Sequence, residues 1–268
     1  MTVAESIPRA ARIVTIRPES PDTRTFVVVP DRPSAALDAA RPGQFVMLSV
    51  LGHGEAAFTL SMLPASASHG TVTLTVRRVG ELTGALFDLA VGARVGIRGP
   101  FGHGFPEDPA RPAIYVAGGC GLSPLKAAID RHVATRPSGT PIAIVYGVRD
   151  PAWRIHRDAL AAWAHLPEVH LIECAEQACA DWQGRVGSVV DVLAEAVALA
   201  GARRAAVCGP PVMLPAVARR LCHLGLDAGD IHVALERYMK CGTGHCGHCY
   251  VNQRYVCTDG PVFSFAEL

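Results

Sequence analysis

Residues 115–129, YVAGGCGLSPLKAAI, hold the pattern that decides the fold: an apolar strand, a Gly-rich turn and a helix follow one another. From Pro109 to about residue 235, continuous apolar strands alternate strictly with segments of helical spacing. This alternation predicts a doubly wound parallel sheet. Strands are expected at 113–119, 142–148, 169–175, 205–210 and 231–236, and helices at 123–134, 156–166, 188–200 and 215–225.

The turn between the first strand and its helix is a candidate pyrophosphate site. Gly118, Gly119 and Gly121 allow a close approach of the backbone, and Ser123 and Pro124 open a helix with free N–H groups. The spacing is not G-x-G-x-x-G, and many Gly-rich turns are turns only. The position favours the site, because the turn opens the first strand–helix unit of a parallel sheet.

A second Gly-containing strand end follows later in the same region, at VCGPPVM. Cys208 and Gly209 stand at the carboxyl end of that strand, where ligands bind in such folds. Cys208 is a candidate for approaching a nicotinamide, and the alternative is a small strand residue.

Residues 1–108 show a different pattern, with short β-rich runs separated by Gly, Pro and Ser. Strands are expected at 25–29, 44–50, 58–62, 71–79 and 94–100, with one helix at 83–90. A closed or nearly closed antiparallel barrel would bury such strands.

The third region, residues 236–268, contains Cys241, Cys246, Cys249 and Cys257 in the spacing C-x4-C-x2-C-x7-C. Plant-type [2Fe-2S] centres take ligands from C-x4-C-x2-C and one distant cysteine. A zinc site is the main alternative, although structural zinc usually takes two C-x2-C pairs and only one is present. Disulfides or free thiols are a further alternative. So short a segment needs a metal centre for its stability.

The other five cysteines, Cys120, Cys174, Cys179, Cys208 and Cys222, have no comparable grouping. Apart from Cys208, they are interpreted as small packing residues. The net charge of +1, without any block of like charges, argues against binding to nucleic acid or an anionic membrane. No apolar run is long enough to span a bilayer, and the start of the chain has no apolar signal core, so we expect a cytoplasmic protein.

These motifs together resemble the ferredoxin–NADP reductase superfamily over essentially the whole chain. The resemblance implies an FAD-binding barrel at 1–108, an NAD(P)-binding domain at 109–235 and a [2Fe-2S] segment at 236–268. Within that superfamily, the chain looks like the iron–sulfur flavoprotein subunits of dihydroorotate dehydrogenase, anaerobic sulfite reductase and cytosolic nickel–iron hydrogenase (sulfhydrogenase). ERYMKCGTGHCGHC followed by YVCTDGPVFSF looks closest to the gamma subunit of the hydrogenase type.

Carried over residue by residue, the resemblance implies contacts with both the flavin and the nucleotide. The flavin contacts are Phe58, Thr59, Leu60, Ser61, Arg77, Gly80, Leu82 and Thr83, with GPFG at 99–102 closing the domain. Many relatives carry an Arg just before the aromatic-Ser/Thr strand, but Ala56 and Ala57 stand here, so Arg77 or Arg78 would have to replace it. Arg149 and Arg154 would meet the adenosine ribose or its 2′-phosphate, which leaves NADP and NAD both open.

The resemblance also implies a function. Such a chain passes electrons between NAD(P)H, FAD and a [2Fe-2S] cluster, to or from the catalytic and iron–sulfur subunits of a complex. A nickel–iron hydrogenase is the expected partner, and a stand-alone reductase for a diffusible acceptor is an alternative. An obligate subunit should expose an apolar docking patch near Cys241 to Cys257. Phe263 and Phe265 are expected either to cap the flavin or to anchor the tail in a groove.

Overall fold

The computed structural model describes residues 7–64 and 70–268. The first six residues, part of the chain start in which the sequence shows no apolar signal core, lie outside the described residues. The chain forms two compact units. The first contains Met1–Gly104 and Glu236–Pro261, and the second contains Phe105–Leu235 and Val262–Leu268. The segment 236–268 is therefore shared between the units, and its four cysteines lie in the first.

The first unit contains a closed barrel of six strands in the order β1-β2-β5-β4-β3-β6, with all neighbours antiparallel. The strands are β1 (Arg9–Ser20), β2 (Thr23–Pro30), β3 (Phe45–Val50), β4 (Gly54–Met62), β5 (Val72–Arg77) and β6 (Arg94–Phe101). Two short helices accompany them, α1 (Ala35–Asp38) and α2 (Glu81–Asp88). Closure leaves no free sheet edge at which another strand could pair.

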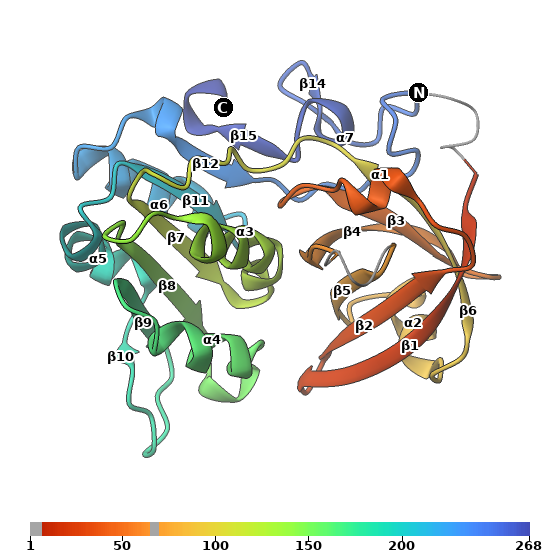
Figure 1. Cartoon of the computed structure of the whole chain (residues 1–268), viewed down its shortest axis with the longest axis horizontal. Coiled ribbons are helices and arrows are strands. Elements are labelled where there is room, and N and C mark those ends of the chain that lie inside the picture. Colours follow the sequence, from red (N-terminus) through yellow and green to blue (C-terminus); the bar gives the residue numbers. More distant parts are fainter. Residues whose placement is uncertain (1–6, 65–69) are drawn as a thin grey trace. The chain divides into compact units, whose positions relative to one another are not determined.

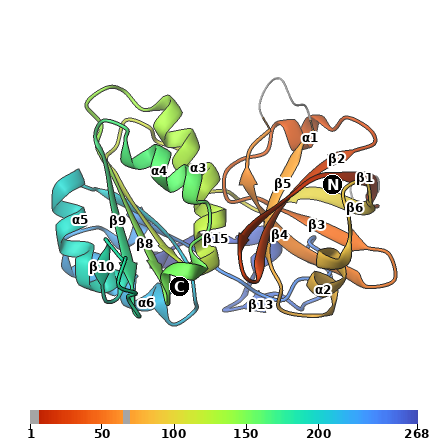
Figure 2. The same cartoon turned by 90° about the horizontal axis from the view of Figure 1, so that it is seen from below.

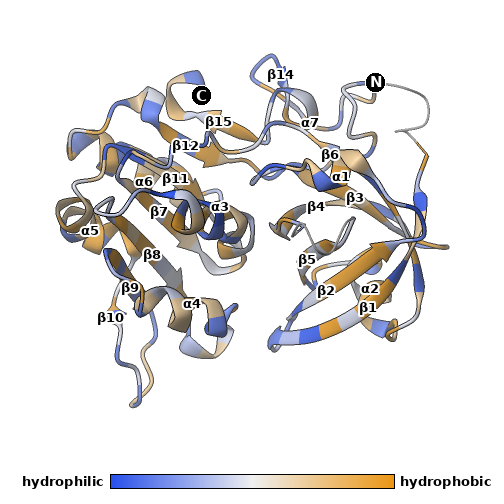
Figure 3. Cartoon of the chain, viewed as in Figure 1, coloured by the Kyte–Doolittle hydropathy of each residue, from blue (hydrophilic) through white to orange (hydrophobic). Residues whose placement is uncertain are grey.

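The barrel is filled by the inward-facing residues of each strand. In β2, Phe26 and Val28 are fully buried and belong to one core cluster with Leu48, Leu60 and Leu74 from three other strands. Figure 3 shows β2 as largely hydrophobic, whereas β1 mixes hydrophobic and hydrophilic residues. Strand β1 is absent from the sequence prediction because this mixture of residues has no clear period.

The second unit contains a seven-stranded sheet in the order β10-β9-β8-β7-β11-β12-β15. Its strands are β7 (Ala113–Gly118), β8 (Ile142–Val148), β9 (Val169–Ala175), β10 (Arg185–Val186), β11 (Arg204–Cys208), β12 (Ile231–Ala234) and β15 (Val262–Ser264). All neighbours are parallel except β12 and β15. Together with the barrel, this confirms the predicted fold class.

Helices cover both faces of this sheet, as Figure 2 shows. They are α3 (Leu122–Thr135), α4 (Arg157–Ala164), α5 (Leu193–Ala200) and α6 (Met213–His223). Alternate residues of β7 serve different faces: Tyr115 packs with the cluster under α3 and α4, and Val116 packs with the cluster under α5 and α6. A strand buried on both sides must be apolar throughout, which explains the continuous runs in the sequence.

The C-terminal tail adds an antiparallel strand at one edge of the sheet (Figure 1). Phe263 of β15 pairs with Val233 of β12 and is 2 % exposed. Phe265 packs against the core cluster of the α5 and α6 face. The tail is therefore anchored by sheet pairing and burial. Among the helices of the described residues, none has the length and apolarity needed to cross a membrane.

Candidate functional site

The carboxyl ends of β7 and β11 meet at the point where the strand order reverses. From β7 the chain continues through β8 to β9 on one side and returns to β11 on the other. The register pairs Cys208 with Ala117, so the turn after β7 and the residues after β11 are neighbours. Ligands of open α/β sheets bind at such switch points. The structure therefore brings together the two Gly-containing strand ends that the sequence singled out.

The glycines of this turn are required for different physical reasons. A Cβ on Gly121 would lie 2.3 Å from the carbonyl oxygen of Cys208, and a Cβ on Gly118 would lie 2.6 Å from Sδ of Met213. Gly119 has φ +52° and faces open space, with no atom within 4 Å of an added Cβ. Gly121 allows close packing of the turn against the end of β11, and Gly118 allows close packing against the first residue of α6. Gly119 leaves its backbone accessible.

Further residues that the sequence predicts to bind the nucleotide lie at the start of α3 and at the end of β11. Ser123 is 4 % exposed, and its Oγ lies 3.1 Å from Nε2 of His156, the residue preceding α4. Pro124 lies in the first turn of α3. Cys208 is 1 % exposed, and Gly209 approaches the Gly118 backbone nitrogen so closely that an added Cβ would lie 3.1 Å from it.

The two arginines after β8 differ in their environment. Arg149 is exposed. Arg154 forms an ion pair with Glu173 of β9, with 2.7 Å between Nε and Oε2, and its guanidinium lies 5.5 Å from the centre of the Trp182 ring. Burial raises the pKa of Glu173, and the charge of Arg154 opposes that shift. The guanidinium of Arg154 is thus already bound to a carboxylate.

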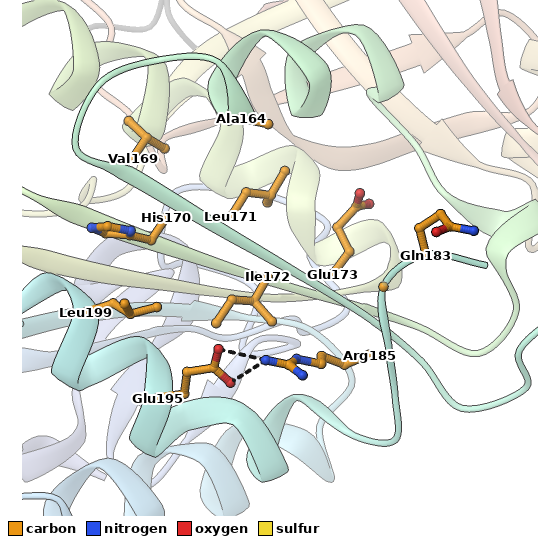
Figure 4. A pocket seen from close by; sticks show the side chains of 11 residues that line it. Ala164, Val169, His170, Leu171, Ile172, Glu173, Gln183, Arg185, Glu195 and Leu199 are labelled. Atoms are coloured by element: carbon orange, nitrogen blue, oxygen red, sulfur yellow. Dashed lines mark hydrogen bonds and ion pairs between the residues drawn. The ribbon is translucent and has the colours of Figure 1, made fainter.

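A surface pocket of about 510 Å³ lies beside strand β9, lined by His170, Glu173 and Leu199 among others. The Arg185–Glu195 ion pair, 2.8 Å between Nη2 and Oε1, stands at its wall (Figure 4). None of the nucleotide or flavin residues expected from the sequence lines this pocket.

The expected flavin strand is β4, and its four candidate residues are not equivalent. Phe58 and Thr59 are half-buried, whereas Leu60 and Ser61 are buried. Leu60 belongs to the barrel core, and the Ser61 hydroxyl donates to the Thr73 carbonyl at 3.1 Å. Of these four candidates, the side chains accessible to a ligand are therefore those of Phe58, which also packs against the barrel core, and Thr59.

The start of α2 matches the expected diphosphate site in part. The Thr83 hydroxyl accepts hydrogen bonds from the backbone N–H groups of Val79 and Gly80, both at 2.9 Å, and donates to the Gly80 carbonyl at 3.0 Å. The remaining N–H groups of the first turn, including that of Leu82, have no acceptor within the helix. Arg77, also expected here, forms an ion pair with Asp22 at 2.7 Å.

A hairpin brings the third and fourth cysteines of the cluster segment together. Strands β13 (Tyr250–Val251) and β14 (Arg254–Tyr255) pair antiparallel, and the Val256 N–H donates to the Cys249 carbonyl at 3.2 Å. Cys249 precedes the hairpin and Cys257 follows it, in helix α7 (Val256–Asp259). The seven-residue spacing before the last cysteine is thus the length of a hairpin.

Backbone N–H groups in the preceding loop point at two of the sulfur atoms. Thr243 and His245 donate to Sγ of Cys241, both at 3.4 Å, and Gly244 donates to Sγ of Cys257 at 3.2 Å. The glycines at 242, 244 and 247 have φ between +74° and +76°, which lets the loop turn sharply around the sulfurs. N–H donors to sulfur are typical of iron–sulfur sites, so the residues present fit a cluster.

The thiols of this segment have shifted pKa values. Burial opposes the ionisation of Cys241, but hydrogen bonds from the backbone N–H groups of Thr243 and Cys246 outweigh it and lower its pKa to about 5. Burial and the neighbouring Cys249 thiol raise the pKa of Cys257 to about 12. Among the described residues, no three His, Cys, Asp or Glu side chains are grouped to hold a single metal ion.

The sequence reasoning missed two residues next to this segment, Arg98 of β6 and Glu55 of β4. Arg98 is 7 % exposed and donates hydrogen bonds to Glu55 and to the carbonyls of Lys240 and Cys241. The only available signal was an arginine inside an apolar strand, in RVGIRGP.

A flavin-type barrel, a nucleotide-type sheet and an iron–sulfur segment define a reductase with three redox elements, and comparison with known proteins agrees. Residues 10–105 match the oxidoreductase FAD-binding domain, and 115–219 match the oxidoreductase NAD-binding domain. Residues 236–268 match the iron–sulfur cluster binding domain of dihydroorotate dehydrogenase B. The chain belongs to the ferredoxin reductase-like family that carries this iron–sulfur domain.

Two relatives illustrate the family. The sulfhydrogenase 2 subunit gamma of Pyrococcus furiosus is 33% identical over 249 residues, covering 84% of this chain and 83% of that protein. A probable dihydroorotate dehydrogenase B electron transfer subunit of Thermococcus kodakarensis is 34% identical over 233 residues, covering 85% and 86%.

Solved structures share the fold. The NADH-dependent reduced ferredoxin–NADP oxidoreductase structure, from work on flavin-based electron bifurcation, aligns with a TM-score of 0.77 and 23% identity, covering 96% of this chain and 88% of that one. A cytochrome P450 reductase of Amycolatopsis aligns with a TM-score of 0.72 and 27% identity, covering 84% and 68%.

Proposed function

We propose that the chain is the electron-transfer flavoprotein subunit of an oxidoreductase complex, working between NAD(P)H, FAD and a [2Fe-2S] cluster. Nicotinamide exchanges electrons in pairs and a single [2Fe-2S] cluster exchanges them singly, and FAD joins the two kinds of exchange. The observation that carries this proposal is the four-cysteine loop, which has N–H groups directed at its sulfurs and belongs to the same compact unit as the barrel.

Different residues of the chain would bind each cofactor. For the cluster, the four cysteines Cys241, Cys246, Cys249 and Cys257 would be the ligands. For FAD, Phe58 and Thr59 would contact the ring system from β4. The remaining N–H groups of the first turn of α2 would bind the diphosphate, in a turn fixed by the hydrogen bonds of the Thr83 hydroxyl with Val79 and Gly80.

For the nicotinamide nucleotide, the accessible backbone at Gly119 and the N-terminus of α3 would bind the pyrophosphate. Arg149 would be the residue left for the adenosine end, because Arg154 is paired with Glu173. Cys208 ends β11 at the switch point, beside the turn, where the nicotinamide ring would bind.

As the catalytic partner we favour a cytoplasmic nickel–iron hydrogenase of the sulfhydrogenase type. The resemblance of the cysteine segment and the gamma subunits of P. furiosus support it. The dihydroorotate dehydrogenase B electron transfer subunits, with identities as high as 34%, support a second candidate in which the partner oxidises dihydroorotate. Anaerobic sulfite reductase remains a further alternative from the resemblance.

Exposed aromatic side chains around the cysteines support a role as a subunit rather than as a stand-alone reductase. Tyr238 is 67% exposed and Tyr250 is 53% exposed, and Cys246 is also exposed. The Tyr238 ring packs against His248 with centroids 5.9 Å apart, and Tyr250 packs against Tyr255 at 5.1 Å. Aromatic residues are enriched at protein interfaces.

The test is co-expression of the chain with a hydrogenase large and small subunit pair, and separately with a dihydroorotate-oxidising subunit. The proposal expects hydrogen-dependent reduction of NAD(P) by the first complex only. Dihydroorotate-dependent reduction of NAD by the second would establish the other partner. NAD(P)H oxidation by the chain alone, with neither complex forming, would contradict a role as a subunit.

A further inference from the structure

Arg98 is a buried arginine, with 7 % of its surface exposed. It lies on β6 of the barrel, opposite Met47 of β3. Burying a guanidinium is costly unless all its charge is compensated, so a buried arginine needs a reason. The contacts of Arg98 supply one.

Arg98 donates four of its five N–H groups: two to the carboxylate of Glu55 and two to backbone carbonyls. Nε donates to Oε1 of Glu55 at 2.8 Å and Nη2 donates to Oε2 of the same carboxylate, so the ion pair is bidentate. Nη2 also donates to the Lys240 carbonyl at 2.8 Å, and Nη1 donates to the Cys241 carbonyl. Glu55 neutralises the charge, and the outer edge of the guanidinium holds the backbone of the first cysteine.

The loop that follows Cys241 is packed on the same surface of the barrel. A Cβ on Gly242 would lie 3.2 Å from the Phe101 ring and 3.5 Å from Met47. The guanidinium of Arg98 lies 5.4 Å from the centre of the Phe101 ring. Beyond Gly242, Thr243 and His245 direct their N–H groups at Sγ of Cys241. The carbonyl held by Arg98 is thus the fixed start of the turn that surrounds this sulfur.

We propose that Arg98, held by Glu55, is a positioning residue for the iron–sulfur cluster: it fixes the Lys240 and Cys241 carbonyls so that the following N–H groups reach the Cys241 sulfur. The inference rests on the proposed cluster site. Hydrogen bonds to cluster sulfur and positive charge nearby stabilise the reduced, more negative cluster, so they raise its reduction potential. Loss of Arg98 therefore lowers that potential and loosens the ligand.

A lysine is a poor substitute for this role. It places one compact charge and cannot span a carboxylate and two carbonyls with a rigid planar fork. The structure therefore predicts that Arg98→Lys keeps the charge but not the position of the loop.

The experiment compares Arg98→Lys, Arg98→Met and a matched control, Arg94→Met, in the full-length protein loaded with FAD and cluster. Arg94 lies on the same strand, but its side chain is 64% exposed and lies 3.8 Å from Asp31. The readouts are iron per chain, the rate of iron loss to a chelator, the electron paramagnetic resonance spectrum and the midpoint potential of the cluster, with FAD absorbance as an internal reference.

We expect both Arg98 variants to lose iron faster than wild type, on the order of tenfold for Arg98→Lys, with a more negative midpoint potential and unchanged FAD content. Arg94→Met should match wild type in every readout. The inference is overturned if Arg98→Lys keeps the wild-type iron-loss rate and potential. Should Arg98→Met fail to fold, as loss of FAD would show, Arg98→Lys and Glu55→Gln decide the matter by the same readouts. A wild-type protein that binds FAD but shows no cluster signal would instead refute the proposed function.

Discussion

Replacing Gly121 with alanine tests the close approach of the two strand ends at the switch point. The added Cβ would lie 2.3 Å from the oxygen and 2.5 Å from the carbon of the Cys208 carbonyl, and 2.7 Å from the Gly209 nitrogen. Ordinary contact begins at 3.4 Å, so β11 and the turn would have to separate by about 1.1 Å (3.4 − 2.3). All three atoms are backbone, and β11 is hydrogen-bonded to a strand on each side.

The size of the effect follows from that overlap. Gly121 has φ −62° and ψ −12°, an ordinary helical conformation, so alanine brings no backbone strain and the whole cost is steric. We expect a loss of about 3 kcal/mol in the free energy of unfolding, at the upper end of the range for overpacking. A shift of about 1 Å in a positioned ligand lowers the rate on the order of a hundredfold. Reduction of the flavin by NADH or NADPH should fall by that factor.

The assay combines urea unfolding with anaerobic stopped-flow reduction of the flavin. Gly201→Ala, just after α5, is the matched control, because φ +54° costs about 1 kcal/mol in strain, no atom lies within 4 Å of the new Cβ, and the residue belongs to no proposed site. Dithionite should still reduce the flavin of Gly121→Ala, since the barrel belongs to the other compact unit. The reasoning is refuted if Gly121→Ala is as stable as wild type and is reduced by nucleotide at the wild-type rate.

Three further changes have defined outcomes. Gly244→Ala, at φ +76° and with its Cβ 3.2 Å from Thr258, should destabilise the cluster loop by about 1 kcal/mol and speed chelator-driven iron loss; an unchanged rate would contradict this. Thr83→Val should cost about 1 kcal/mol and weaken FAD binding, measured by flavin release, because two N–H groups lose their acceptor; unaltered release would count against the site. Burial lowers the pKa of His132 from 6.5 to about 4. Between pH 6.5 and pH 4, His132 is therefore protonated in the unfolded chain and neutral in the folded chain. Stability should therefore fall by at most about 3 kcal/mol as pH drops from 6.5 towards 4, and His132→Gln should flatten this dependence in urea titrations.

Local patterns predicted the elements whose environment is uniform along their length. Strand β8 occupies the residues expected, 142–148, because a strand covered on both faces of the sheet is apolar throughout. Strand β1 was not predicted, because its partners β2 and β6 bury only some of its residues and RAARIVTIRPES shows no clear period. Strand β15 was also missed, because three residues carry too little pattern and their pairing partner lies far back in the chain.

In the candidate site, too, local patterns were predicted from the sequence and long-range contacts were not. The cysteine spacing and the Gly-rich turn are local, and the structure places them in a sulfur-directed loop and at a switch point. The contact between Arg98 and Cys241 joins residues 143 positions apart, so no sequence window contains it. The pairings Arg77–Asp22 and Arg154–Glu173 are likewise long-range, and they change what each arginine is free to bind.

The most direct test of the central claim is an anaerobic titration of the purified full-length protein with NADH and with NADPH. Flavin absorbance and the electron paramagnetic resonance spectrum are recorded at each addition. The account predicts that the flavin bleaches and a reduced [2Fe-2S] signal appears, with the better nucleotide identified by the smaller excess required. Absence of any cluster signal in iron-replete protein, even after dithionite, would contradict the assignment of Cys241, Cys246, Cys249 and Cys257 as its ligands.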